Sequence, residues 1–424
     1  MAKIKPFQAV IYNKDKNKNF SNLVCPPYDV ISPEKQRAFH SRDPHNFIHL
    51  ELALDGKDED KYLKAGDTFR AWLAEKVLIQ DETPALYFYS HQYTIKGEKK
   101  VRLGFMGLLH LGRGGASAHG HEHTHLDAKE DRLKLIKQVK ANLSPIFIVF
   151  PDEKRIVQRI YRHVLNEKPF LEVTDEDKAI HKIWRITSPE MLETIQSSMI
   201  DESIFIADGH HRFEVACAYR DEMKKQHPDS SDEEEYNYVM AYFTNTESRG
   251  LTILPIHRLL KLPQPPDPEV FAKQLGDYFE IEEVKDKSRF FFLMQKGGRT
   301  EHLIGTCIHG KYWLLRLRNI RILDKLIPDK PKEYRYLDVS ILNAIVLKKI
   351  LGVNLDDRSV LTFHPEAQDL IDRVNADKSY IAFLLNPVKM EQIMSVAMTG
   401  NKMPPKSTFF YPKVISGLLV HSLE

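Results

Sequence analysis

The chain has 424 residues, of which 28% are charged and 42% hydrophobic. At about 150 residues per domain, this length predicts two or three domains or one large one. The hydrophobic share is enough for a packed core and excludes a globally disordered chain. Lys and Arg number 61 and Asp and Glu 59, a net charge of +2 that argues against a general polyanion binder.

The sequence also lacks the signals of export and membrane insertion. No apolar run approaches the roughly 18 residues of a membrane span, and the N-terminus has no apolar core of a secretion signal. Three widely separated cysteines make neither a disulfide framework nor a zinc knuckle. We therefore expect a cytoplasmic protein with no membrane partner.

The N-terminal part predicts irregular structure, then a hairpin, a helix and a strand. Residues 85–95 and 99–111 have the aromatic and β-branched content of paired strands joined by a Lys-Gly turn. Residues 129–143 have apolar positions near helical spacing, and 145–150 has the apolar run of a buried strand. Prolines at positions 26, 27 and 33 predict that the first forty residues are irregular.

The middle of the chain predicts alternating helices and strands. A helix over 188–200 begins with a Ser-Pro start signal. The period then changes from strand to helix in SIFIADGHHRFEVACAYRDEMKK, and strands follow at 236–244 and 251–256. The proline cluster at 262–270 predicts a linker or an insertion boundary.

The C-terminal part predicts a hairpin over 301–318 that turns at a His-Gly pair. Helices over 338–351 and 365–374, a strand from 380 and a helix near 389–397 follow. Because strands and helices alternate throughout, the expected fold class is α/β or mixed α+β.

The strongest candidate site is the sequence IADGHHR. A strand ends at Asp208, Gly209 permits a tight turn and a helix begins near His210, so the first-turn N–H groups form an anion site. His210, His211 and Arg212 add cationic donors, and Arg212 can hold phosphate oxygens through two parallel bonds. Asp208 would bind Mg²⁺, accept from a substrate or orient a histidine. The alternative is a plain helix cap with a solvated first turn.

A histidine-rich segment follows the predicted hairpin. His121-Glu122-His123-Thr124-His125 fits H-E-x-x-H, a zinc protease pattern that works only on a helix. The glycine-rich flank and the alternating histidines indicate a loop or a strand instead. We expect incidental metal affinity, or a role for Glu122 as an acid, a base or a metal-binding carboxylate, rather than zinc proteolysis.

Other polar residues are weaker candidates, each with a structural alternative. The segment NFIHLE is interpreted as a half-buried strand with Glu51 on one face, and Pro-Pro-Tyr-Asp-Val as a rigid turn that carries Asp29. Residues 129–132 open a helix and are typical of a solvated face. Arg258 follows a strand, and the loop MPPKST carries a lysine and a serine. Walker A, G-x-G-x-x-G and G-x-S-x-G motifs are absent.

The chain resembles one bacterial and archaeal family, domain of unknown function one thousand and fifteen, from about residue 7 to residue 418. Seven segments carry the resemblance: CPPYDVIS, HEHT, KEDRLKL, IADGHHRFEVA, LPIHRLL, YLDVSIL and MPPKSTFFYPKVISGLL. DGHHR is similar to the signature of the ParB/sulfiredoxin superfamily, in which such a strand, turn and helix cradle nucleotide phosphates. The extra histidines around 117–128 depart from the family pattern.

The resemblance implies a ParB/sulfiredoxin-like nucleotide-binding core within a mixed α/β fold that has large N-terminal and C-terminal elaborations. The segments expected on this basis are an N-terminal mixed region at 1–150, a core with DGHHR at 151–262, an insertion or lid at 263–332 and a C-terminal region completing the core at 333–424.

The family resembles kinases of free L-serine, which implies an ATP-dependent enzyme that makes O-phospho-L-serine. Such transfer needs positioned phosphates, neutralised charge and a base near the hydroxyl. Phosphate-binding residues would be Gly209, His210, His211 and Arg212, with Mg²⁺ bridging the phosphates and Asp208 as its candidate ligand. Candidate bases are Glu51, then Glu122, then Asp29. Candidate residues for the serine carboxylate are Arg258, Lys406 and Ser407.

Two other functions stay open at this point. One is a non-catalytic ParB-like nucleotide-binding regulator, and the other is a metal-dependent hydrolase that uses the histidine segment. No helix-turn-helix and no basic face are predicted, so we expect no nucleic-acid partner. The expected partners are a nucleotide and a small amino acid, and the oligomeric state, including a homodimer, stays open.

Overall fold

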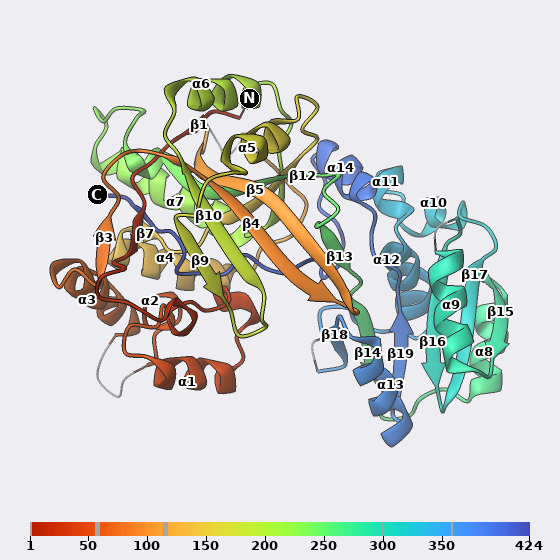
Figure 1. Ribbon diagram of the computed structural model, residues 1–424. Helices are drawn as coiled ribbons and strands as arrows, with labels where there is room; N and C mark the ends of the chain where they lie inside the picture. The colour runs from red at the N-terminus through yellow and green to blue at the C-terminus, as the bar shows by residue number, and fades with distance from the viewer. Residues whose placement is uncertain (1, 56–59, 113–117, 299, 358) are drawn as a thin grey trace. The chain divides into compact units, whose positions relative to one another are not determined.

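The computed structural model describes residues 2–55, 60–112, 118–298, 300–357 and 359–424 (Figure 1). The chain divides into two compact units. The first contains residues up to 120, residues 124–252 and residues 412–424, and the second contains residues 121–123 and 253–411. The glycine-rich stretch at 113–117 lies outside the described residues.

The two units do not follow the four segments expected from the sequence. Strands from both 1–150 and 151–262 hydrogen-bond into one sheet, which keeps those segments together. The C-terminal residues also return to the first unit, where β21 (His421–Ser422) pairs with β7 (Ala141–Asn142).

The first unit is built on a nine-stranded mixed sheet with the order β6-β11-β8-β12-β5-β4-β10-β9, and β1 pairs with β5. Its strands are β1 (Ile4–Lys5), β4 (Leu86–Ile95), β5 (Glu98–His110), β6 (His119–Gly120), β8 (Ile146–Phe150), β9 (Leu171–Thr174), β10 (Ile180–Ile186), β11 (Phe205–Asp208) and β12 (Tyr238–Asn245). The predicted hairpin is β4–β5. Its turn has positive φ at both Lys96 and Gly97, as a tight hairpin requires.

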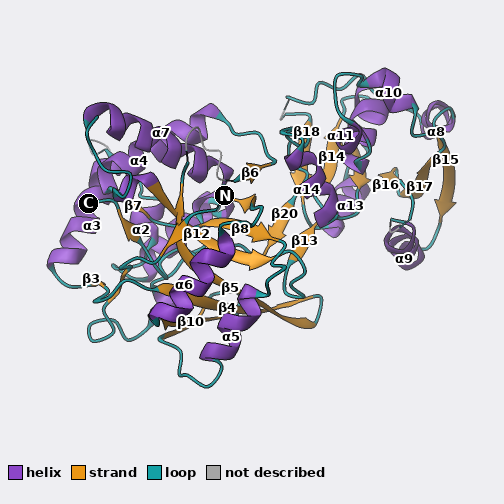
Figure 2. Cartoon of the chain, turned by 90° about the horizontal axis from the view of Figure 1, so that it is seen from above, coloured by secondary structure: helices purple, strands orange, loops and turns teal. Residues whose placement is uncertain are grey.

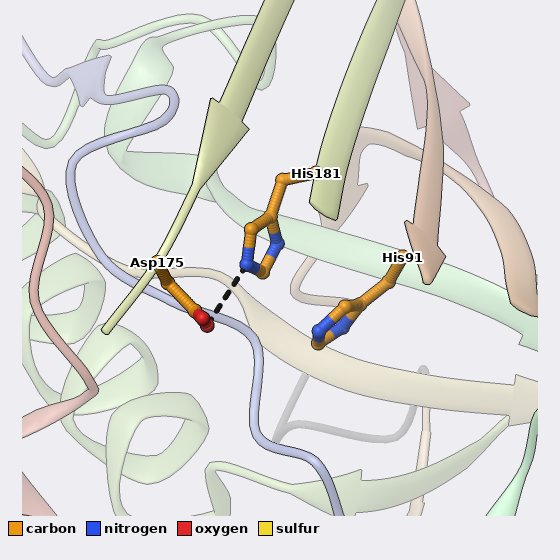
Figure 3. A group of neighbouring side chains, drawn as sticks. All are labelled: His91, Asp175 and His181. Atoms are coloured by element: carbon orange, nitrogen blue, oxygen red, sulfur yellow. Dashed lines mark hydrogen bonds and ion pairs between the residues drawn. The ribbon is translucent and has the colours of Figure 1, made fainter. Parts of the chain in front are cut away.

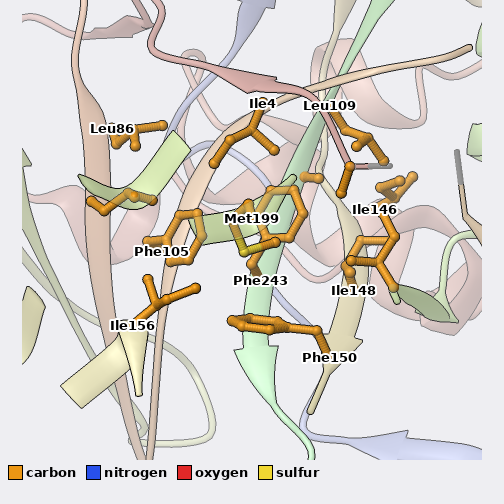
Figure 4. Packing of buried hydrophobic residues seen from close by; sticks show 14 of the residues in the cluster. Ile4, Leu86, Phe105, Leu109, Ile146, Ile148, Phe150, Ile156, Met199 and Phe243 are labelled. Carbon is orange, nitrogen blue, oxygen red and sulfur yellow. The ribbon is translucent and has the colours of Figure 1, made fainter. Parts of the chain in front are cut away.

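One face of this sheet carries an apolar core (Figure 4). Phe105 of β5 stacks on Phe243 of β12 with 5.0 Å between ring centroids. Helices α5 (Ile156–Val164) and α6 (Pro189–Met199) lie side by side and bury their apolar positions in this cluster (Figure 2). The expected Ser188 cap of α6 is confirmed.

A second core lies among four helices of the first unit, α1 (Pro33–Arg42), α2 (Ile48–Glu51), α3 (Lys61–Ala74) and α4 (Leu126–Val139), with the short strands β2 (Val10–Tyr12) and β3 (Leu78–Gln80). The expectation of irregular structure before residue 40 is wrong for α1. Ser32 accepts a hydrogen bond from Lys35 N–H, and Pro33 occupies the first helical turn, where proline is tolerated.

Two further local expectations need correction. The strand predicted for NFIHLE is the short helix α2, because the Asn46 side chain accepts a hydrogen bond from Ile48 N–H and turns the chain. The helix predicted over 129–143 ends at Val139. Lys140 is left-handed, with φ 52°, and the next two residues form β7.

The second unit is built on an antiparallel sheet with the order β15-β17-β16-β19-β14-β18. Its strands are β14 (His257–Lys261), β15 (Phe279–Val284), β16 (Leu303–Ile308), β17 (Lys311–Leu317), β18 (Leu361–His364) and β19 (Tyr380–Leu384), and β13 (Thr252–Leu254) and β20 (Phe409–Tyr411) pair separately. The predicted turn at His309 and Gly310 is confirmed.

The helices of the second unit are α8 (Pro268–Gly276), α9 (Lys287–Gly297), α10 (Ile322–Leu326), α11 (Lys332–Arg335), α12 (Asp338–Ile341), the π-helical run η5 (Leu342–Ile350), α13 (Ala367–Ala376) and α14 (Met390–Met398). Part of the predicted linker is thus α8, whose first turn is capped by Asp267. The mixed α/β class is confirmed. Within the described ranges, no helix combines the length and the apolar character needed to cross a bilayer.

The first core predicts a large loss of stability on truncation. Leu109→Ala removes a side chain with 0% exposure and should lower the free energy of unfolding by about 2–5 kcal/mol. Leu126→Ala, at 73% exposure in the same unit, should change it by no more than about 0.5 kcal/mol. Urea denaturation followed by circular dichroism measures both, and equal effects would contradict the placement of this core.

Candidate functional site

The strand, turn and helix predicted at IADGHHR are present. Strand β11 ends at Asp208, and α7 (His210–Gln226) follows directly. Gly209 has φ +87°, a conformation that other residues rarely adopt, and an added Cβ would lie 3.0 Å from Arg212 Nε. The N–H groups of the first turn have no intrahelical carbonyl partner, and they form the positive end of a 17-residue helix.

Arg212 is held in place by two acceptors. Its Nη2 donates to Asp208 Oδ2 at 2.7 Å, and its Nη1 donates to the carbonyl of Pro145. The side chain is 12% exposed, so Arg212 is largely covered rather than open to solvent at the helix start. The Nε atom is buried and has no hydrogen-bond partner. Arg212 therefore keeps one positioned donor for a ligand.

Lys413 joins this pair and was not identified from the sequence. Its Nζ donates to Asp208 Oδ1 and lies 3.3 Å from Asp29 Oδ2. Burial raises the pKa of the Asp29 carboxyl, but Lys413 and Arg212 outweigh burial and hold this pKa below its ordinary value. Acidic and basic groups thus alternate from Asp29 through Lys413 and Asp208 to Arg212.

This arrangement bears on the expected metal role of Asp208. Mg²⁺ takes carboxylate oxygens as ligands, but one oxygen of Asp208 already accepts from Arg212 and the other from Lys413. The residue therefore does not fit a Mg²⁺ ligand while Lys413 stays on it.

A small pocket in the first unit, lined by equal numbers of polar and apolar residues, has a volume of about 50 Å³. Its polar lining residues are Tyr28, Glu51, Arg132, Asn142, Ser144 and Arg212. At roughly 10–15 Å³ for each water, a pocket of this size holds a few small polar groups and not a whole nucleotide.

Glu51 is the buried acid of this pocket, with 1% exposure. Its Oε1 accepts from Tyr28 N–H at 3.4 Å and from the Ser144 hydroxyl at 3.3 Å. Its Oε2 is buried and has no hydrogen-bond partner. A buried carboxylate oxygen that accepts nothing is costly, and here it belongs to a residue that lines a pocket.

Arg132 and Tyr28 complete the pocket around Glu51. Arg132 Nη1 donates to the Glu51 carbonyl at 2.8 Å, and its guanidinium lies 4.3 Å from the centre of the Tyr28 ring. Burial raises the pKa of Tyr28 to about 12, which keeps the phenol neutral. The helix run at 129–132 was expected to be a solvated face, but Arg132 is buried and belongs to the pocket.

The histidine segment does not form a zinc-protease site. Helix α4 begins at Leu126, so H-E-x-x-H is not helical, as expected from its glycine-rich flank. The Thr124 hydroxyl donates to Glu214 at 2.7 Å, and His125 N–H donates to His211 Nε2 at 3.0 Å. Over the described residues, the group with metal-ligand spacing lies elsewhere, at β4, β9 and β10.

The remaining predicted residues, Glu122, Arg258, Lys406 and Ser407, belong to the second unit. Arg258 is buried, and its Nη2 donates to the Lys406 carbonyl at 2.9 Å, which braces the loop. Burial lowers the pKa of Arg258 to about 9. The Ser407 hydroxyl donates to the Pro404 carbonyl at 2.5 Å, and Lys406 is exposed.

The family model described as "Protein of unknown function (DUF1015)" matches residues 4–340. The chain belongs to this family. No curated protein matches the sequence.

Three similar solved structures illustrate the likeness. A free serine kinase variant in complex with ADP is 12% identical, with a TM-score of 0.34 over 69% of this chain and 83% of that one. A conserved hypothetical protein from Pyrococcus furiosus is 12% identical, with a TM-score of 0.32 over 69% and 86%. SbnI with a C-terminal truncation, from Staphylococcus aureus, is 9% identical, with a TM-score of 0.37 over 74% and 86%.

The contacts of Lys413 predict a stability that depends on pH. Because the folded pKa of Asp29 is lowered, its contribution is present above the unfolded pKa near 3.8 and is lost as pH falls through the folded value. Lys413→Met should lower the free energy of unfolding by about 1–3 kcal/mol at pH 7. The difference from the wild type should shrink by pH 3.

Urea denaturation at both pH values measures this effect. Lys406→Met is the matched control, because Lys406 is exposed on the same C-terminal motif, and it should change stability little at either pH. A Lys413→Met deficit that is the same at pH 7 and pH 3 would contradict the assigned ion pairs.

Proposed function

We propose that the protein is an ATP-dependent kinase of free L-serine that transfers the γ-phosphate to the serine hydroxyl and forms O-phospho-L-serine. The observation that carries the proposal is the buried Glu51 Oε2, which has no partner, in a pocket that also contains Arg212 of the DGHHR helix. A general base and a phosphate-binding cation are the two groups that this transfer requires from the protein.

Glu51 is the proposed general base. Tyr28 N–H and the Ser144 hydroxyl hold Oε1, which leaves Oε2 to take the proton of the serine hydroxyl. The serine oxygen then forms its bond to the γ-phosphorus while the bond from that phosphorus to the bridging oxygen breaks and ADP leaves. Asp29, another candidate base, is occupied by Lys413. Glu122 stays a candidate in the second unit.

The start of α7 is the proposed phosphate site. The Gly209 N–H group, His210, His211 and Arg212 would hold the phosphates of ATP, which supplies the transferred phosphoryl group. The partnerless Nε of Arg212 fits this role, since a charge-assisted hydrogen bond to a phosphate oxygen satisfies it.

Charge neutralisation at this end falls to Lys413, the cation that Asp208 holds in place. A bound Mg²⁺ would supply Lewis-acid neutralisation of the phosphates. Asp208 would be free to hold it once Lys413 had moved away, and until then Lys413 itself supplies a cation beside Arg212.

The serine carboxylate needs a cation of its own. The sequence offers Arg258, Lys406 and Ser407 for this role, and the structure describes them within the second unit taken by itself. Arg258 has a buried Nε without a hydrogen-bond partner, whereas its Nη atoms donate to backbone carbonyls. The exposed Lys406 is the more accessible cation.

A non-catalytic nucleotide-binding regulator is the second candidate function. It would use the same phosphate site at α7 and would have no need of Glu51. The consecutive ion pairs from Asp29 through Lys413 and Asp208 to Arg212 favour the regulator. They connect the phosphate site to the C-terminal segment, so nucleotide binding could move that segment without any reaction taking place.

Phosphorus-31 NMR with Mg²⁺-ATP and a panel of free amino acids tests the reaction. The protein is first treated with a chelator and then resupplied with Mg²⁺ alone. The expected result is a phosphomonoester signal with L-serine and with no other amino acid. Nucleotide binding without transfer to any acceptor would instead support the regulator.

The roles of Glu51 and Arg212 predict that substitution of Glu51 lowers kcat, whereas substitution of Arg212 lowers nucleotide affinity. Glu51→Gln keeps the shape of the buried side chain and should lower kcat by about 10²–10⁴-fold with nucleotide affinity unchanged. Arg212→Lys should weaken nucleotide binding. Glu122→Gln is the matched control for the base, and a larger loss of kcat in that variant would transfer the role to Glu122.

A further inference from the structure

A buried polar row crosses the sheet of the first unit. His181 of β10 lies directly opposite His91 of β4, and His91 lies directly opposite Arg102 of β5. Residues directly opposite each other in antiparallel strands share one face of the sheet. All three side chains are at most 1% exposed. None of them lines the pocket of Glu51.

The histidines of this row have the spacing of a metal site. Ligand atoms of His91, Asp175 and His181 lie within 4.8 Å of one another (Figure 3). His181 Nε2 lies 3.0 Å from Asp175 Oδ2, and His181 Nδ1 lies 2.6 Å from the Tyr89 hydroxyl. With Asp175 ionised, His181 donates from Nε2 and accepts from Tyr89 at Nδ1.

The position of the proton on His91 argues against a metal. Arg102 Nη2 lies 3.1 Å from His91 Nδ1, and a guanidinium can only donate. Nδ1 is therefore the accepting nitrogen, and the proton of the neutral ring is on Nε2. A metal ligand needs a lone pair at that atom, and a divalent cation would also face the charge of Arg102.

The groups around Arg102 that lack partners are hydrogen-bond donors. Its Nε and Nη1 and the Nε2 of His91 are buried without a hydrogen-bond partner, whereas the Tyr242 hydroxyl interacts with Arg102 and Thr244. The guanidinium lies 4.6 Å from the ring centre of Phe147 and 5.5 Å from that of Tyr242, so aromatic rings cover it. Over the described ranges, Arg102 forms no ion pair, and Asp175 is bonded instead to His181.

A buried guanidinium without a counter-charge is strongly unfavourable. A water molecule would accept some of these hydrogen bonds but would leave the charge, whereas a small anion accepts the bonds and neutralises the charge. We propose that Arg102, with His91 Nε2, binds a compact monovalent anion of the size of chloride inside the first unit. This site is separate from the proposed kinase site and does not depend on it.

Thermal unfolding at constant ionic strength tests the proposal, with sodium chloride replacing sodium gluconate, whose anion is too large for an enclosed site. The midpoint should rise by about 2–3 °C for each tenfold increase of chloride above its dissociation constant. Arg102→Met should abolish this dependence. Arg220→Met is the matched control and should keep it, because Arg220 is also buried but pairs with Asp221 at 2.7 Å.

Bromide in crystals of the wild-type protein gives a direct readout that does not require the variant to fold. An anomalous peak beside the Arg102 guanidinium is the expected result, and repeating the crystals with formate shows whether a small carboxylate competes for the site. No bromide peak together with no chloride dependence would overturn the proposal, leaving water as the partner. Stoichiometric zinc or iron lost in His91→Ala would also overturn it, in favour of a metal site.

Discussion

The ion pair between Arg212 and Asp208 is the interaction on which the candidate site depends. Asp208 is the last residue of β11 and Arg212 lies in the first turn of α7, so the pair closes the turn at Gly209 and fixes the direction of the helix start. The second bond of Arg212, to the Pro145 carbonyl, ties the same turn to the segment that enters β8. The donors at the start of α7 are thereby fixed relative to the sheet before any ligand arrives, which is the preorganisation that electrostatic catalysis requires.

The pocket beside this turn is lined by residues that are far apart in sequence and that the fold of the first unit brings together. Tyr28 comes from a short 3-10 helix (Tyr28–Val30), Glu51 from α2 and Arg132 from α4, and Ser144 lies two residues before β8. Arg212 comes from α7. Backbone groups hold two of these side chains, since Tyr28 N–H donates to the Glu51 carboxylate and the Glu51 carbonyl accepts from Arg132. The pocket is therefore a product of packing in the first unit, and its shape depends on α2 being a helix rather than a strand.

The parts of this site that depend on neighbouring residues in the sequence can be predicted from it. The parts that depend on contacts between residues far apart in sequence cannot. The strand, the glycine turn and the helix start lie within a few residues, so their change of period and the positive φ of Gly209 are predictable. Glu51 was named on the wrong element, because Asn46 turns the chain through a side-chain bond that apolar periodicity does not register. Lys413 was missed because it meets Asp208 across 205 residues of sequence. Nothing local distinguishes it from Lys406, the lysine chosen from the same motif.

The arginines in the interior of the first unit differ in whether a carboxylate close in sequence pairs with the guanidinium charge. Arg132, Arg212 and Arg220 each pair with an aspartate within four residues of sequence, namely Asp131, Asp208 and Asp221. Each of these arginines has its aspartate close by in the chain sequence, so the arginine is buried together with a negative charge. The free-energy penalty of burying an unpaired guanidinium is thereby avoided. Arg102 is as deeply buried, and its Nη2 donates to a neutral imidazole on the neighbouring strand, His91. The first unit thus compensates Arg132, Arg212 and Arg220 locally, whereas Arg102 has no such neighbour, and the proposed anion supplies the negative charge that it lacks.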